Sequence, residues 1–160
     1  MKKHYLGILV SGALLAASAA AAQAATATNT FQARITIIAQ CEITSPTDLD
    51  FGSQGLLNSN VDATATFNVR CNENLSYNIA LDDGQNASGG SSRMTDGNGH
   101  YVTYELYQDS NHSTLWDATN TVASTGTGVD QTFTIYGRVP PQSTPPVGNY
   151  SDTVTITVTY

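Results

Sequence analysis

Few side chains in this sequence are of the types that carry out covalent or metal chemistry. Cys41 and Cys71 are the only two cysteines in 160 residues. Two thiols in a small domain of an exported protein most simply pair, because disulfides persist in oxidising compartments. Closing the 30-residue loop between them would stabilise the fold by about 3.6 kcal/mol on the chain-entropy estimate. No histidine lies near either cysteine to complete a metal site. The sequence therefore predicts a Cys41–Cys71 disulfide and no bound metal.

Residues that could serve in catalysis are placed unfavourably for it. His100 and His112 stand beside polar and turn-forming residues, so we expect both to be surface histidines. The segment Gly52-Ser53-Gln54-Gly55 differs from the nucleophile-elbow pattern G-x-S-x-G. Asp82-Asp83-Gly84 is typical of a turn, and Asp96-Gly97-Asn98-Gly99 predicts a tight turn without the later acidic ligand of a calcium loop. We therefore expect no enzyme, no cofactor and no small-molecule substrate.

The beginning of the chain indicates export. Lys2 and Lys3 precede an apolar run from Leu6 to Ala17, and Ala22-Gln23-Ala24 has the small-x-small form of a cleavage site. The alternative is an uncleaved membrane anchor, which needs about 20 strongly apolar residues, whereas this run ends in alanines. We predict that residues 1–24 are a cleaved signal peptide.

Cleavage after Ala24 would leave 136 residues, the size of one domain. This mature chain has no lysine, and its four arginines against 13 acidic residues give a formal charge of −9. Nucleic-acid binding depends on cations that neutralise phosphates, so a nucleic-acid partner is disfavoured. The negative charge is expected to keep an exported protein soluble.

The body of the chain is built from short segments in which apolar and polar residues alternate. Period-two alternation of β-branched and aromatic residues between turn-formers predicts an antiparallel β-sandwich or barrel. A glycine- and serine-rich loop is expected at 86–92, and the proline pairs Pro140-Pro141 and Pro145-Pro146 should end one strand and stiffen the approach to the last. The expected strands lie near residues 63–71, 77–81, 102–106, 133–139 and 154–160.

The segment 25–40 has a strand pattern but is too long for its place. Phe31, Ala33, Ile35 and Ile37 alternate with polar residues, which predicts a strand with one apolar face. Its 16 residues span about 50 Å when extended at ~3.3 Å each, against roughly 17–20 Å for an ordinary strand. We expect the surplus to form an arm that inserts into another molecule. A strand that returns to its own sheet is an equally open alternative at this point.

The last predicted strand places Val154, Ile156, Val158 and Tyr160 on one face and runs to the final residue. No turn and no closing strand follow it in the sequence. We expect this strand to border a vacancy that the arm of another copy would fill, giving head-to-tail polymers.

Several segments together resemble the archaic chaperone–usher pilus subunits of the spore coat protein U-like family. They occur in the family's order and cover nearly all of the predicted mature chain. They are FQARITIIAQC before the first cysteine, LDFG at 49–52, FNVRC at 67–71, YNIALDDG at 77–84, VTYELYQDSNHSTLW at 102–116, FTIYGRVPPQ from Phe133, and GNYSDTVTITVTY at 148–160.

The resemblance implies an all-β fold, an incomplete immunoglobulin-like antiparallel β-sandwich completed by a donor strand from a neighbouring subunit or a chaperone. It implies a donor arm at 25–40, with donor residues Phe31, Ala33, Ile35 and Ile37, followed by a single pilin domain at 41–160. Ala33 is smaller than the branched residue expected there, so the pocket that it meets is expected to be shallow. The family's disulfide falls on Cys41 and Cys71.

The function implied is that of a structural subunit of an extracellular pilus, supporting adhesion and biofilm formation. Its implied partners are identical or related pilin subunits, a periplasmic chaperone and an outer-membrane usher. A shaft subunit is favoured, because 136 residues leave no room for the extra receptor-binding domain of a tip adhesin.

Two alternatives remain open from the sequence. Tyr101, Tyr104, Tyr107, Trp116 and Tyr136 could form an aromatic face of a secreted carbohydrate-binding module. The simpler interpretation is that Tyr104 packs inward with Val102 and Leu106 while the other aromatic residues lie outside. The second alternative is a surface or spore coat protein that uses the same domain without an organised fibre.

Overall fold

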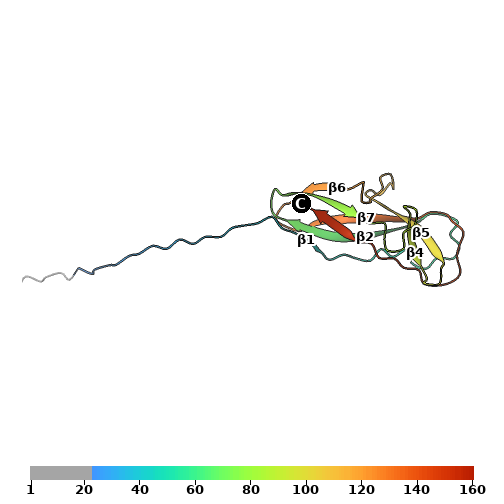
Figure 1. Cartoon of the computed structure of the whole chain (residues 1–160), viewed down its shortest axis with the longest axis horizontal. Coiled ribbons are helices and arrows are strands. Elements are labelled where there is room, and N and C mark those ends of the chain that lie inside the picture. Colours follow the sequence, from blue (N-terminus) through green and yellow to red (C-terminus); the bar gives the residue numbers. More distant parts are fainter. Residues whose placement is uncertain (1–22) are drawn as a thin grey trace, which may run out of the picture. The chain divides into compact units, whose positions relative to one another are not determined.

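The computed structural model describes residues 23–160, so the predicted signal peptide lies almost entirely outside the described residues. The described part contains eight β-strands and no helix (Figure 1). The strands are β1 (Cys41–Thr44), β2 (Val61–Cys71), β3 (Ser76–Leu81), β4 (Ser92–Thr95), β5 (Tyr101–Tyr107), β6 (Val122–Thr125), β7 (Gln131–Val139) and β8 (Ile156–Thr159).

The strands form two antiparallel sheets. One has five strands in the order β1-β2-β7-β5-β4, and the other has three in the order β6-β3-β8. Alternate residues of β2, β3, β5 and β7 are buried, and they meet in one hydrophobic cluster to which both sheets contribute. Period-two patterning thus puts one face of each sheet into a shared core, and the predicted all-β antiparallel sandwich is confirmed.

Four aromatic residues fill the core near the disulfide-bearing end of β2. The Phe67 ring stacks on Phe133 with centroids 5.7 Å apart and lies 5.9 Å from the Trp116 ring, while Tyr77 meets Phe133 edge-on. Trp116 is only 3% exposed, and its indole N–H donates to the Ile79 carbonyl at 3.0 Å. The expectation that Trp116 lies outside was therefore wrong. Trp116 follows the regularly alternating segment, so the pattern gives no guide to its position. It is buried because its large ring gains from packing in the core and its N–H has a hydrogen-bond partner there.

His112 also differs from the sequence expectation. Its side chain is only 7% exposed and packs edge-on against Tyr107 at 5.0 Å and against Tyr136 at 6.4 Å. The backbone at His112 has a positive φ of 55° in the loop that follows β5, a turn that brings the ring back over the sheet. The polar residues next to His112 in the sequence give no indication that the loop turns its ring back onto the sheet. His100, by contrast, has a partly exposed ring as expected.

The turn predictions agree well with the structure. Asp96 to Gly99 connects β4 to β5, with positive φ at Gly97 and Gly99 and with the Asp96 carboxylate accepting from the Asn98 amide. The β7 strand ends at Val139, immediately before the first proline pair. The short strands β1, β4 and β6 were not predicted, since four-residue segments carry too little alternation to distinguish them from loops.

Residues 23–40 are extended but belong to no strand. The described part of the chain up to Thr36 and the segment Ile37–Tyr160 are separate structural units. The strand expected at Phe31–Ile37 is therefore absent from this structure, because a strand needs a ladder partner and this segment has none among residues 23–160.

Candidate functional site: a groove and an exposed arm

The disulfide lies where the arm joins the sandwich. Cys41 and Cys71 form the predicted bond and are direct partners in the β1–β2 ladder. Gln40 extends that ladder by one step, since its N–H donates to the Asn72 side-chain oxygen at 2.6 Å and its carbonyl accepts from the Asn72 N–H at 3.1 Å. The base of the arm is thus held both covalently and by backbone hydrogen bonds.

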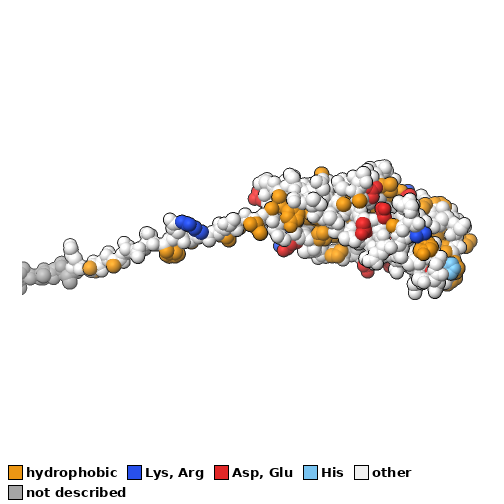
Figure 2. Space-filling view, in the orientation of Figure 1, with side chains coloured by type: hydrophobic (Ala, Val, Ile, Leu, Met, Phe, Trp, Pro, Cys, Tyr) orange, Lys and Arg blue, Asp and Glu red, His pale blue; other side chains and the backbone are white. Residues whose placement is uncertain are grey.

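The arm itself exposes its apolar side chains to solvent. Phe31 is 91% exposed, Ile35 85% and Ile37 70%. Hydrophobic side chains are spaced along this extended segment in Figure 2. Of the polar residues between them, Arg34 donates to the Gln32 side-chain oxygen. Large apolar residues exposed in a regular series indicate a surface that binds a partner.

The terminal strand β8 is paired along one edge only within the described residues. It pairs with β3, in the register Leu81↔Ile156 to Asn78↔Thr159. The predicted inward residues Val154, Ile156 and Val158 are only half-buried, although all three pack against the core, and Tyr160 is exposed. Val154 and Tyr160 lie just outside the strand as the structure defines it. An edge strand with half-buried apolar residues is a template for a further strand.

A groove of about 600 Å³ lies beside this strand. One rim is the segment 46–50 and the other is the segment 150–156, while the floor comes from the five-stranded sheet. The apolar lining residues are Pro46, Leu49, Ala65, Met94, Tyr104, Leu106, Ile135, Tyr150, Val154 and Ile156. The structure thus places two of the four predicted inward residues, Val154 and Ile156, in the lining of the groove.

Small residues under the groove make it deep and allow its rim to approach the sheet closely. Ala65 pairs with Ile135 at the floor, one inward position along from the bulky Phe67–Phe133 pair. Gly137 lies under the rim residue Leu49, and a Cβ at this glycine would come within 2.5 Å of the Leu49 side chain. Sequence alternation identified the rim strand but not this floor, because the depth of the groove depends on how two sheets face each other.

One polar network fixes the groove at the start of the terminal segment. The buried Tyr104 hydroxyl donates to Asp152 at 2.8 Å, and the other Asp152 oxygen accepts from the Asn86 backbone and side chain at 3.1 and 2.8 Å. Burial first, and then the Asp152 carboxylate, raise the pKa of Tyr104 well above its usual value. Gly84 is required beside this network, since a Cβ there would lie 1.9 Å from Asp152.

Asp82, which directly follows β3, holds the terminal segment at Thr155 by hydrogen bonds. Its N–H donates to the Thr155 carbonyl at 3.1 Å, and its carboxylate accepts from the Thr155 and Gly84 amides. Burial raises the pKa of Asp82, but the hydrogen bonds from Thr155 and Gly84 outweigh it and leave that pKa below its usual value. The turn residue predicted at this position therefore also positions the terminal strand.

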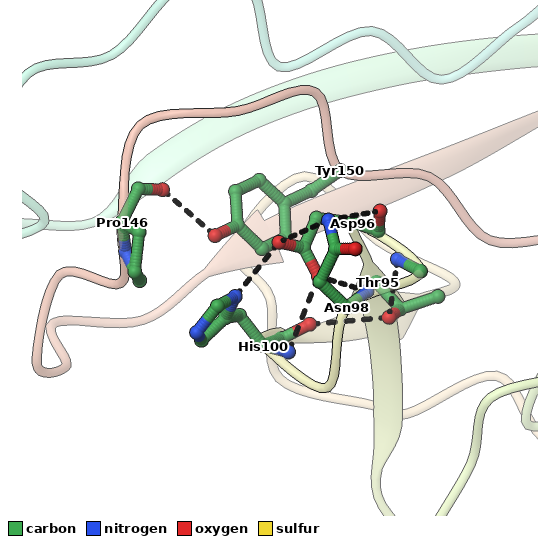
Figure 3. A network of polar contacts seen from close by, with 7 residues as sticks. Thr95, Asp96, Asn98, His100, Pro146 and Tyr150 are labelled. Atoms are coloured by element: carbon green, nitrogen blue, oxygen red, sulfur yellow. Dashed lines mark hydrogen bonds and ion pairs between the residues drawn. The ribbon is translucent and has the colours of Figure 1, made fainter.

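A second network closes the same end of the sandwich (Figure 3). Asp96 lies 2.7 Å from His100 Nδ1, and the Tyr150 hydroxyl donates to the Pro146 carbonyl at 2.7 Å. The hydrogen bond with His100 holds the pKa of Asp96 far below its usual value. Thr95 and Ser151 exchange backbone hydrogen bonds and so join β4 to the terminal segment.

Residues 23–160 contain no group of three or more His, Cys, Asp and Glu side chains arranged to hold a metal ion. In the same part of the chain, we find no helix with the length and apolar character needed to cross a membrane. The sites that the structure does present are the groove and the arm.

Comparison with known proteins gives the family. The family model of the Spore Coat Protein U domain matches residues 27–157. The chain belongs to this family. The match starts within the arm and ends at residue 157, halfway along β8, so it includes most of the arm and all the residues that line the groove.

One chain of a solved structure has the same fold as this Spore Coat Protein U domain. It belongs to the CsuC–CsuE chaperone–tip adhesion subunit pre-assembly complex from the archaic chaperone–usher Csu pili of Acinetobacter baumannii. The TM-score is 0.59 at 22% identity, over 78% of this chain and 40% of the other. The chain thus spans less than half the length of that protein. No curated protein matches the sequence.

Proposed function

We propose that this protein is a structural pilus subunit that polymerises by donor-strand complementation. The observation that carries the proposal is the presence, in one chain, of an apolar groove beside an open edge strand and of an exposed arm with alternating apolar residues. The arm could supply the strand that the groove lacks, and the groove could supply the ladder partner that the arm lacks. Among residues 23–160 the arm has no ladder partner, and the groove has an unpaired rim.

The energetics favour exchange between molecules. Burying Phe31, Ile35 and Ile37 would contribute roughly 1.5–3 kcal/mol each, or about 5–9 kcal/mol gross. Ladder hydrogen bonds would add about 0.5–1.5 kcal/mol each. Domains are typically stable by only ~5–15 kcal/mol, so an inserted arm accounts for a large share of the stability of the assembled subunit.

The same reasoning supports a chaperone partner. A subunit with an open groove and an unpaired edge is prone to edge-to-edge aggregation until the groove is filled. A periplasmic chaperone that lends a strand would protect it, and an outer-membrane usher would exchange that strand for the arm of the next subunit. The family and the likeness to a chaperone–subunit pre-assembly complex support this route. The proposal includes signal-peptide cleavage after Ala24, export through the periplasm, and an extracellular pilus that supports adhesion and biofilm formation.

The carbohydrate-binding alternative is weakened by the structure. Two of its five aromatic residues, Tyr104 and Trp116, are buried in the core. Tyr101 remains partly exposed and lies under the Arg93 guanidinium at 4.1 Å. Tyr107 and Tyr136 are half-buried, and both rings pack against His112.

The arm can be tested with one substitution. Ile35→Asp places a charge where an apolar residue would be buried, and should abolish fibres while leaving export intact, since Ile35 is exposed in the unassembled chain. Thr36→Asp is the matched control on the polar face. Electron microscopy of cells and SDS-resistant, heat-labile ladders measure the outcome. Abundant fibres from Ile35→Asp would refute the proposal, and a surface layer without fibres in the unmodified protein would favour a coat protein.

A further inference from the structure

The groove has two different ends, and the arm leaves the sandwich at only one of them. Thr159 pairs with Asn78 close to the start of β3, near the end where Gln40 and Asn72 hold the base of the arm. Ser151 pairs with Thr95 at the opposite end. A donor strand antiparallel to β8 brings its own sandwich to the Ser151 end, so copies follow one another head to tail. With a parallel donor, the copy that donates to a subunit and the copy that accepts that subunit's arm would both lie at the end where the arm leaves. They would compete for space there.

The groove also differs in depth along its length. Val154 and Ile156 line the cavity together with Ala65, Ile135 and Met94. Val158 and Tyr160 are not among the lining residues that the structure describes. In the same direction along the floor, the stacked Phe67 and Phe133 rings fill the core in place of Ala65 and Ile135. The cavity is therefore deep at Val154 and Ile156 and shallow towards Val158.

Over positions 33 to 37 the arm has a matching profile of side-chain size. Its four apolar residues are spaced two apart, as are the four inward residues of the terminal strand, so each set spans roughly 20 Å. Ile35 and Ile37 are large and adjacent in the series, and Ala33 is the small member. On the basis of the proposed function, we propose the register of the donor strand: Ile37 opposite Val154, Ile35 opposite Ile156, Ala33 opposite Val158 and Phe31 opposite Tyr160.

Registers displaced by two residues fit less well. If the arm moved so that Ile35 met Val154, Ala33 would lie over the deep cavity at Ile156 and leave it empty. If it moved the other way, so that Ile35 met Val158, the small Ala39 would reach the deep position at Val154 and fill it poorly. A displacement by one residue would turn the apolar face formed by positions 31 to 37 to solvent. The small residue at position 33 therefore acts as a determinant of register.

The second of these displacements also has a steric cost. Ala39 directly precedes Gln40, which is hydrogen-bonded to Asn72 of its own sandwich. A donor with Ala39 opposite Val154 would bring that sandwich against the Ser151 end of the acceptor. In the proposed register two further residues of arm separate the two bodies, which leaves room for both.

The backbone of the terminal segment defines where the strands would touch. The Thr155 N–H and carbonyl both bond to Asp82, and the Thr153 carbonyl accepts from Gln85. By alternation, the peptide groups of Val154 and Ile156 face the free edge. Thr155 would then form a non-hydrogen-bonded pair with Thr36 of the donor, with Cα atoms about 4.5 Å apart and both side chains on the solvent face.

This geometry permits a direct test by cross-linking. A pair of Cα atoms about 4.5 Å apart is within the range that a disulfide bridges, whereas diagonal neighbours at roughly 7–8 Å are not. Full-length chains carrying Thr36→Cys together with Thr153→Cys, Thr155→Cys or Thr157→Cys are assembled in the cells that produce the protein. Boiled, non-reduced fibres are then separated by SDS gel. Each single-cysteine variant is the control for unspecific bonding.

The expected result is a covalent ladder from Thr36→Cys with Thr155→Cys and little from the other two pairs. Fibres that cross-link through Thr153→Cys or Thr157→Cys, or through none of the pairs, would overturn the register while leaving the pilus function intact. If deletion of residues 25–37 did not prevent fibre formation, the proposed function itself would fail, and the two results are thereby distinguished.

A second variant tests the shallow position without touching the sandwich. Ala33 is exposed in the unassembled chain, so Ala33→Leu leaves the fold of the body unchanged. In the proposed register the larger side chain meets the filled part of the core, and fibre yield should fall at least tenfold. Thr36→Leu is the control, on the solvent face. A yield that stays level or rises with Ala33→Leu would place position 33 over the deep cavity and contradict the register.

Discussion

The two ends of this sandwich are built in different ways. At the disulfide-bearing end the core is filled by the chain's own aromatic rings, Phe67, Tyr77, Phe133 and Trp116. At the other end small residues at the floor leave a groove of about 600 Å³, and polar networks around Asp82, Asp96 and Asp152 hold its rim. The first end has a fully packed core, whereas the second has a hydrogen-bonded rim around a groove that the chain itself does not fill. We therefore expect stability to depend mainly on the first end and the proposed assembly on the second.

The largest expected effect comes from the aromatic end. Phe67→Ala removes a fully buried ring that contacts two other rings, and should lower the free energy of unfolding by about 3–5 kcal/mol. Ile156→Ala, on the half-buried groove side, is the comparison and should cost clearly less in the unassembled subunit. Urea unfolding of both variants measures the difference. Equal losses would contradict the division between the two ends.

The disulfide is expected to contribute almost as much. Replacing Cys41 and Cys71 together by serine frees a loop of 30 residues and should cost about 3.6 kcal/mol in unfolding free energy. The base of the arm would also lose its covalent attachment to β2. Thermal unfolding before and after reduction of the unmodified protein provides a parallel measurement. An unchanged melting temperature would show that the ladder alone holds this end.

At the groove end, single polar contacts should have smaller effects. Tyr104→Phe removes the hydroxyl that donates to Asp152, a bond to a charged group worth about 1.5–3 kcal/mol. Asp152 retains its hydrogen bonds from Asn86, so the terminal segment should loosen without detaching. Faster hydrogen exchange confined to residues 150–156 is the expected signature. Tyr101→Phe, at a partly exposed tyrosine, is the control.

Acid should weaken the groove end first. The pKa values of Asp82 and Asp96 are lowered in the folded chain, so their contribution is present above the unfolded value of about 3.9 and is lost as the pH falls from there through the lowered folded-state values. On β2 and β7 the carboxylate with a lowered pKa is Asp62, which is hydrogen-bonded by Arg138 at the end of these strands away from the disulfide, and the stacked rings of Phe67 and Phe133 lie further along. Hydrogen exchange measured as the pH falls from about 4 to about 2 should therefore accelerate at β8 before the parts of β2 and β7 around Phe67 and Phe133. Asp82→Asn should reduce this difference, and uniform acceleration would contradict it.

Local patterns in the sequence were sufficient for much of the fold. Strict alternation in β2, β3, β5 and β7 predicted long strands, because one face of each is buried in a common core. Turn chemistry at Asp96–Gly99 and the proline pair after Val139 predicted where strands end. The short strands β1, β4 and β6 and the burial of Trp116 and His112 were missed, since they depend on loops that return to the sheets from outside the alternating segments.

The sequence by itself determined the class of fold, the disulfide and the unusual pair of apolar strand patterns at the two ends of the predicted mature chain. These follow from residue types and their spacing, which act locally along the backbone. Tertiary structure alone decided that one of those segments borders a groove, that the groove is deep at Ile156, and that Asp82 and Asp152 hold its rim. The reason is that the depth of the groove depends on how the two sheets pack against each other. Ala65 on one sheet and Ile156 on the other are 91 residues apart in the chain, so no local pattern relates them.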